Sequence, residues 1–116
     1  MSLTLAVLSN QARAENCAEK SGRDAIVCAS AAYEVADQQL NMSYQARLTR
    51  LEGNSSKVTK LIADERAWIR KRDADCRELV KSFDLNPLDY SYSVATIDCL
   101  RRATEARTAQ LKSQGR

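Results

Sequence analysis

The densest group of residues with chemical potential is a short segment in which cations surround the single tryptophan. Residues 65–76 read ERAWIRKRDADC, with cations at Arg66, Arg70, Lys71 and Arg72. Trp68, Arg72 and Cys76 recur every four residues, so on a helix they share one face and are predicted to point into a helical bundle. Arg66, Arg70 and Lys71 then remain as solvent-facing candidates for contact with an anionic partner.

The acidic residues show no spacing typical of a catalytic site. No histidine occurs in the sequence, so His-dependent nucleophilic catalysis and the commonest general base at neutral pH are absent. Asp64 and Glu65 are adjacent, and Asp73 and Asp75 are two apart, and such positions do not face one another on a helix. The sequence also has no Gly-rich phosphate loop. We therefore expect no catalytic residue, no cofactor and no enzymatic activity.

Four cysteines, Cys17, Cys28, Cys76 and Cys99, could bind a metal or form disulfides. Their spacings lack the closely spaced pairs of zinc sites, so no metal site is expected. In a small exported domain, four cysteines usually form two disulfides. Cys17 and Cys28 are symmetric about Gly22, and Cys76 and Cys99 about the turn predicted near Pro87, which favours these two local pairs. The same register leaves a more distant partner for Cys17 open.

The N-terminal residues resemble part of a secretory signal peptide. Residues 4–8 are apolar, and Ala12-Arg13-Ala14 has the small-x-small form of a cleavage site. The match is partial, because the apolar run is short and no Lys or Arg precedes it. We expect residues 1–14 to be a signal-peptide remnant, residues 15–116 to form one domain, and the protein to be periplasmic or secreted.

Composition supports a single globular domain. The 116 residues are 44% hydrophobic and 28% charged, with one Pro and three Gly, which excludes disordered, collagen-like and most all-β folds. No apolar stretch is long enough to span a bilayer. The net charge of +3 is spread along the chain and predicts no nucleic-acid partner.

Apolar periodicity predicts three helices. Residues 28–51 form an amphipathic segment, and Ser55 or Ser56 is the predicted N-cap of a second helix that ends near Ser82. Residues 84–91 are predicted to be a loop around Pro87 that exposes Tyr90 and Tyr92. A third helix is predicted from about Ser93. Val58, Leu61, Ile62, Trp68, Ile69, Cys76, Leu79, Val80 and Phe83 form the predicted apolar stripe of the second helix.

The predicted fold is therefore an all-α, antiparallel three-helix bundle with two disulfides. Helices joined by short loops pack side by side, so the turn positions predict which residues face each other. Folding about Asn54 places Asp37 opposite Arg72 and Asn41 opposite Trp68. Asp37 and Arg72 are predicted to form a partly buried ion pair, because a buried guanidinium needs a partner to offset its desolvation.

Two motifs in these helices resemble the LprI-like lysozyme-inhibitor family of small exported bacterial proteins. They are Asp37-x-x-Leu40-Asn41-x-x-Tyr44 after Cys28, and Trp68-x-x-x-Arg72-Asp73-x-x-Cys76 before Cys99. The resemblance implies an envelope location and a disulfide-bonded helical domain. For at least part of the family it also implies binding and inhibition of lysozyme. In the predicted register the motif residues are structural.

Two functions follow as hypotheses. The first is an exported interaction module that binds an unidentified protein of the bacterial envelope. The alternative is a periplasmic inhibitor of lysozyme-type muramidases, although a positively charged protein would not be steered toward a cationic lysozyme. The candidate partner-binding residues are Arg66, Arg70, Lys71, Tyr90 and Tyr92.

Overall fold

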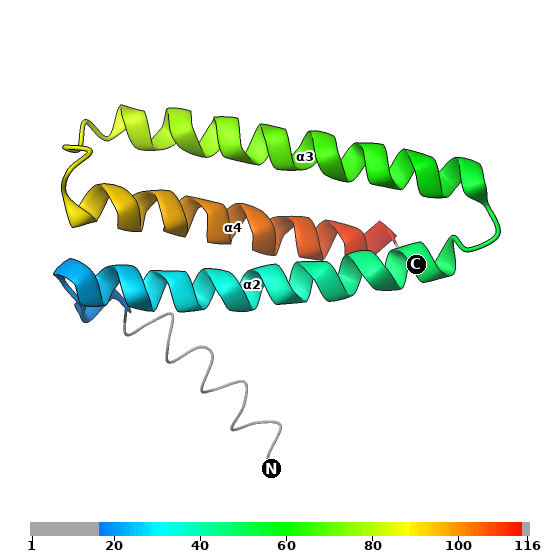
Figure 1. Ribbon diagram of the computed structural model, residues 1–116, viewed down its shortest axis with the longest axis horizontal. Helices are drawn as coiled ribbons and strands as arrows, with labels where there is room; N and C mark the ends of the chain where they lie inside the picture. Colours follow the sequence, from blue (N-terminus) through cyan, green and yellow to red (C-terminus); the bar gives the residue numbers. More distant parts are fainter. Residues whose placement is uncertain (1–16, 115–116) are drawn as a thin grey trace, which may run out of the picture.

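The protein is a bundle of three long helices in a computed structural model that describes residues 17–114 (Figure 1). A short 3-10 helix, η1 (Cys17–Glu19), precedes α2 (Gly22–Arg50), α3 (Ser55–Ser82) and α4 (Tyr90–Gln114). The described residues contain no strand. This confirms the predicted all-α bundle, whereas the expected signal-peptide remnant, residues 1–14, lies outside the described part of the chain.

Helix α4 packs closely against both other helices and lies between them in Figure 1. Because the chain reverses at each turn, α2 and α4 run in the same direction and α3 runs opposite to both. The face of α2 that packs in the bundle carries the buried residues Ala25, Ala29 and Ala36. Such small side chains allow the backbones of α2 and α4 to approach each other closely.

Leu40, Leu61 and Leu111 form the apolar core cluster, one residue from each helix. Thr104 and Thr108 of α4 are also buried. Each Thr hydroxyl is satisfied within its own helix, because it donates a hydrogen bond to the carbonyl four residues earlier, at 2.7 Å and 3.1 Å. The core is therefore small, and these two buried threonines donate their hydrogen bonds within α4.

The residue that caps α3 at the first turn differs from the sequence prediction. The side chain of Asn54 accepts a hydrogen bond from the backbone N–H of Lys57 at 3.1 Å and so caps the helix. The predicted N-caps, Ser55 and Ser56, were wrong because they already lie in the first turn of α3. Gly53, at φ 90°, provides the left-handed backbone conformation that this tight turn requires.

The second turn is shorter than predicted. The side chain of Asn86 accepts a hydrogen bond from the backbone N–H of Leu88 at 3.0 Å, and α4 begins at Tyr90 instead of near Ser93. Tyr90 and Tyr92 therefore belong to the first turn of α4. Tyr90 is exposed as predicted, while Tyr92 is half-buried.

The apolar stripe predicted for α3 is only partly buried. Leu61, Cys76 and Val80 are buried, whereas the predicted core residues Ile69, Leu79 and Phe83 are 40%, 47% and 50% exposed. The physical reason is that close packing of α3 is restricted to α4, which covers a narrow strip of the α3 surface.

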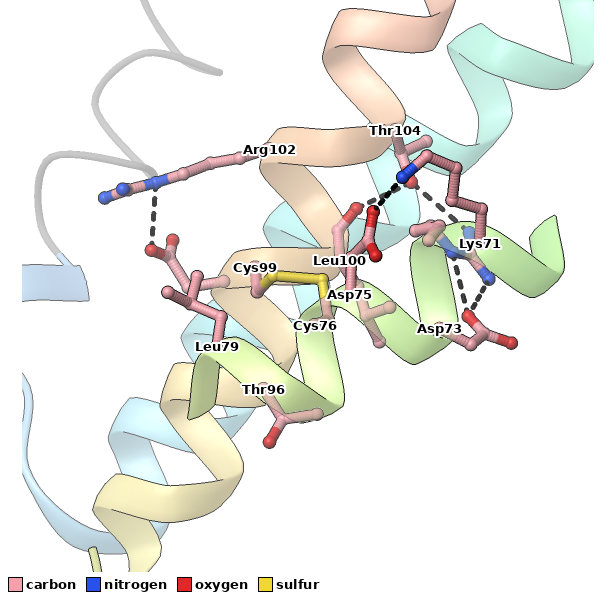
Figure 2. Close-up of a disulfide and its surroundings, with 12 residues drawn as sticks. Lys71, Asp73, Asp75, Cys76, Leu79, Thr96, Cys99, Leu100, Arg102 and Thr104 are labelled. Carbon is pink, nitrogen blue, oxygen red and sulfur yellow. Dashed lines mark hydrogen bonds and ion pairs between the residues drawn. A yellow bond between two sulfur atoms is a disulfide. The ribbon is translucent and has the colours of Figure 1, made fainter. Parts of the chain in front are cut away.

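Both disulfides have the predicted local connectivity. Cys17–Cys28 joins η1 to α2, with Cα atoms 5.5 Å apart, and Cys76–Cys99 joins α3 to α4, with Cα atoms 5.7 Å apart. Figure 2 shows the second bridge between the two helices. Among the helices of residues 17–114, none has the length and apolar character needed to cross a membrane.

Candidate binding surfaces

The centre of the bundle contains an ion pair that sequence reasoning missed. Nε of Arg107 in α4 donates a hydrogen bond to Oε1 of Glu65 in α3 at 2.9 Å, and each side chain is only 10% exposed. Nη1 of Arg107 also donates to Gln110 at 3.2 Å. The available signal was the position of Glu65, four residues after Leu61 and three before Trp68, which places this acid on the apolar face of α3.

Trp68 lies within cation–π distance of two guanidinium groups. The Cζ atom of Arg72 is 5.2 Å from the centroid of the Trp68 ring, and that of Arg107 is 5.7 Å away. Arg72 also lies 6.0 Å from the ring centroid of Tyr33 on α2. The two cations and the indole ring therefore connect all three helices.

The expected ion pair between Asp37 and Arg72 was wrong. Arg72 instead pairs with its neighbour Asp73, from Nη2 to Oδ1 at 2.9 Å, and donates a hydrogen bond from Nη1 to Thr104 at 3.4 Å. Within residues 17–114, the carboxylate of Asp37 makes no ion pair and no hydrogen bond. The guanidinium of Arg72 is satisfied by α3 and α4, so it does not need Asp37.

A groove of about 420 Å³ lies between α2 and α3, and residues of both sequence motifs line it. We call it the motif groove. The lining residues from α2 are Tyr33, Asp37, Leu40, Asn41 and Tyr44, and those from α3 are Ile62, Glu65, Arg66, Trp68, Ile69 and Arg72. The register predicted for the α2–α3 hairpin therefore placed Asp37 and Asn41 correctly at the level of Trp68 and Arg72. Leu40 is buried and Arg72 is bound to Asp73 and Thr104, whereas Asp37, Asn41 and Tyr44 border an open groove.

Tyr44 lines the motif groove and has a raised pKa. Burial raises the pKa of its hydroxyl above the ordinary value of 10.0, the negative charge of Glu65 raises it further, and Arg66 opposes these effects. Tyr44 is therefore a neutral phenol that can donate and accept hydrogen bonds at physiological pH.

The candidate binding cations do not form one basic face. Arg66 and Arg70 are exposed and lie four residues apart on α3, with Arg66 at the edge of the motif groove. Lys71 points away from these two around the helix and forms an ion pair with Asp75 at 2.8 Å. Tyr90 and Tyr92 lie at the far end of α3 and α4, so the five predicted residues occupy separate surfaces.

The end of the bundle at the α3–α4 turn exposes several large apolar side chains. Leu79 is 47% exposed, Phe83 50%, Leu88 92% and Tyr90 55%. We call these four residues the apolar end. Within the described residues, no group of three or more Cys, Asp and Glu side chains is placed to hold a metal ion. Two surfaces that could serve a function are thus the motif groove and the apolar end, and a further groove of about 580 Å³ is lined by residues of α2 and α4.

Comparison with known proteins identifies the family. A family model described as lysozyme inhibitor LprI matches residues 14–111, so the chain belongs to the LprI family that its motifs resemble. The crystal structure of a DUF1311 family protein from Pseudomonas putida KT2440 has a TM-score of 0.72 and 24% sequence identity, covers 82% of this chain and 94% of that chain, and shows the same fold. A search of the curated proteins gave no match.

Proposed function

We propose that this protein is an exported interaction module that binds a lysozyme-type muramidase and inhibits it without catalysing a reaction itself. Family membership supports this class of partner. The observation that carries the proposal is the apolar end, where Phe83, Leu88 and Tyr90 are each at least half exposed at one turn. Clustered apolar side chains on a monomer surface mark protein interaction sites.

The α3–α4 turn is braced by a disulfide and by backbone hydrogen bonds, which favours tight binding. The Cys76–Cys99 disulfide joins the two helices below the turn. Within the turn, the backbone N–H groups of Phe83 and Asp84 donate to the carbonyls of Val80 and Lys81, at 3.1 Å and 3.3 Å. A rigid loop loses little conformational entropy on binding, so more of the contact energy appears as affinity.

The chemistry of a muramidase cleft suits this turn. Glycoside hydrolases of this type place two carboxyl groups on either side of the bond that they cleave, inside a cleft that receives the substrate. A protruding turn that enters the cleft prevents access of the substrate. Because Lys81 at the end of α3 and Asp84 in the turn carry opposite charges, we infer that apolar contact provides most of the affinity and that electrostatic steering contributes little.

The test is a turbidity assay in which a lysozyme-type muramidase clears a suspension of bacterial cell walls. The wild-type protein should slow clearing in a dose-dependent way, and the double variant Phe83→Ser/Leu88→Ser should lose most of this effect. Met42→Ser is the matched control, because Met42 is 73% exposed but lies on α2. Thermal unfolding should show that all three proteins are folded.

Two results would contradict the proposal. If the wild-type protein does not slow clearing, muramidase inhibition is wrong. If the double variant inhibits as well as the control variant, the apolar end is not the inhibitory surface. Capture of a different exported protein by a wild-type column, without inhibition, would leave only the general role of an interaction module.

A further inference from the structure

We propose that the motif groove is a second binding site and that its ligand is a neutral oligosaccharide. The site lies between the middle parts of α2 and α3, whereas the surface proposed to contact a muramidase lies at the α3–α4 turn. A volume of about 420 Å³ is within the usual range for small-ligand sites.

The polar groups on the α2 side of the groove have no hydrogen-bond partner within residues 17–114. Among residues 17–114, the carboxylate of Asp37, the side-chain amide of Asn41 and the hydroxyls of Tyr33 and Tyr44 make no hydrogen bond. No buried side-chain nitrogen or oxygen in the described residues lacks a partner, so these groups must reach the surface. They line one groove with their hydrogen-bonding capacity available to a ligand.

The α3 side of the groove is different, because two of its charged groups are already occupied. Glu65 is paired with Arg107, and Arg72 with Asp73 and Thr104. These contacts, and the two guanidinium groups near the indole ring, fix the position of Trp68. A rigid wall facing a row of unpartnered polar groups is the arrangement of a preorganised binding site.

The charge of the groove favours a neutral ligand. Its charged lining residues are two carboxylates, Asp37 and Glu65, and two guanidinium groups, Arg66 and Arg72. A strongly anionic ligand would lie close to the two carboxylates, and a strongly cationic ligand would lie close to the two guanidinium groups. In either case the ligand would be repelled by like charges, and part of its own charge would have no counter-charge. The groove therefore suits a polar molecule that carries no net charge.

The mixture of lining groups matches the surface of a sugar. A sugar ring has hydroxyl groups that both donate and accept hydrogen bonds at its edge, and C–H groups on its faces. Asp37 accepts, Arg66 donates, and Asn41 and the two tyrosines do both. Leu40, Ile62 and Ile69 supply apolar surface in the same groove for the C–H faces.

Trp68 provides a direct test because it is the only tryptophan in the chain and lines the groove. The folded wild-type protein is titrated with chitotriose and with maltotriose, two neutral oligosaccharides, while its fluorescence and its backbone amide chemical shifts are recorded. We expect a saturable change with at least one of them in the millimolar range or below. The shifted amides should belong to residues that line the groove.

Two single variants separate binding from folding. Asp37→Asn removes a charged acceptor that has no partner in the fold, so it should weaken oligosaccharide binding roughly tenfold or more without lowering the melting temperature. Asp64→Asn is the matched control on α3, because Asp64 is exposed, pairs with Lys60 and does not line the groove. This control should bind like the wild type.

Three outcomes would overturn the proposal. The first is the absence of any saturable fluorescence or chemical-shift change with both oligosaccharides. The second is equal binding by Asp37→Asn and Asp64→Asn. The third is saturable binding of trilysine in place of the oligosaccharides, which would identify a cationic segment of a protein as the occupant of the groove. None of these outcomes affects the turbidity assay with Phe83→Ser/Leu88→Ser, so the two proposals can fail separately.

Discussion

Glu65 of α3 and Arg107 of α4 form a buried ion pair, with Oε1 and Nε 2.9 Å apart, beside the indole ring of Trp68. It joins two helices at the level where the motif groove lies between α2 and α3. A buried pair gains Coulomb energy but loses the hydration of both charges, so its net contribution to stability is small while both partners are present. Its loss is costly when only one partner is removed.

We predict that Glu65→Ala lowers the free energy of unfolding by about 3–5 kcal/mol, because it leaves the Arg107 guanidinium buried without a counter-charge. The double variant Glu65→Leu/Arg107→Leu should recover most of this loss. Urea denaturation followed by circular dichroism measures both. The control is Asp64→Ala, whose exposed ion pair with Lys60 is worth about 0–1 kcal/mol. Equal effects of Glu65→Ala and Asp64→Ala would show that the Glu65 pair is solvated.

We predict that Asp37→Ala changes the free energy of unfolding by less than about 1 kcal/mol, as expected for a surface position without a specific contact. Arg72→Ala should cost more, because Arg72 contacts Trp68, Tyr33, Thr104 and Asp73. A double-mutant cycle should give a coupling energy near zero between Asp37 and Arg72. A coupling of several kcal/mol would restore the direct ion pair that the sequence predicted.

Removal of the Cys76–Cys99 disulfide by Cys76→Ala/Cys99→Ala should destabilise the protein by about 2–5 kcal/mol. The corresponding Cys17→Ala/Cys28→Ala variant should lose less, because its loop closes over 11 residues instead of 23 and η1 packs mainly on α2. Denaturant unfolding of the two variants gives the comparison. A greater loss for the Cys17–Cys28 variant would show that η1 supports the bundle more strongly than its contacts indicate.

We predict that Tyr44 deprotonates at a pH above 10, because burial and the charge of Glu65 raise its pKa. A raised pKa in the folded state stabilises the fold below the unfolded value, and this stabilisation is lost as the pH rises through the folded value. The difference in ultraviolet absorbance between the wild type and Tyr44→Phe during alkaline titration isolates this one phenol. A midpoint at or below 10 would mean that the hydroxyl is fully hydrated.

Much of the fold was predictable from local sequence. Three amphipathic segments and two breaks predicted the helices, and symmetry about Gly22 and about the break near Pro87 predicted the two disulfides. The hairpin register also placed Asp37 and Asn41 at the level of Arg72 and Trp68, and all four line one groove. The register fails for side-chain partners because it describes two helices and does not include the third, which supplies Thr104 to Arg72.

The Glu65–Arg107 pair was also missed because a register between two helices does not identify side-chain partners. The register about Pro87 places Glu65 at the level of Gln110, one turn from Arg107. This register gives the position of a residue along the bundle axis. It does not give the rotation of α4 about its own axis, which decides whether Arg107 faces α3. The exposure of Phe83 and Leu79 was missed for a related reason, because an apolar stripe does not reveal how much of its width a neighbouring helix covers.

The central position of α4 also affects the order in which the protein folds. The alanine face of α2 packs on a helix that is synthesised after both α2 and α3, and Nη1 of Arg47 donates to the carbonyl of Gln114 at 2.8 Å across 67 residues of chain. The α2–α3 hairpin has little core of its own, so it cannot act as an independent folding unit. Such distant contacts raise the contact order, so folding should be slower than in a bundle whose helices pack mainly on their sequence neighbours. A nascent chain that lacks α4 leaves its apolar faces open to chaperones and proteases.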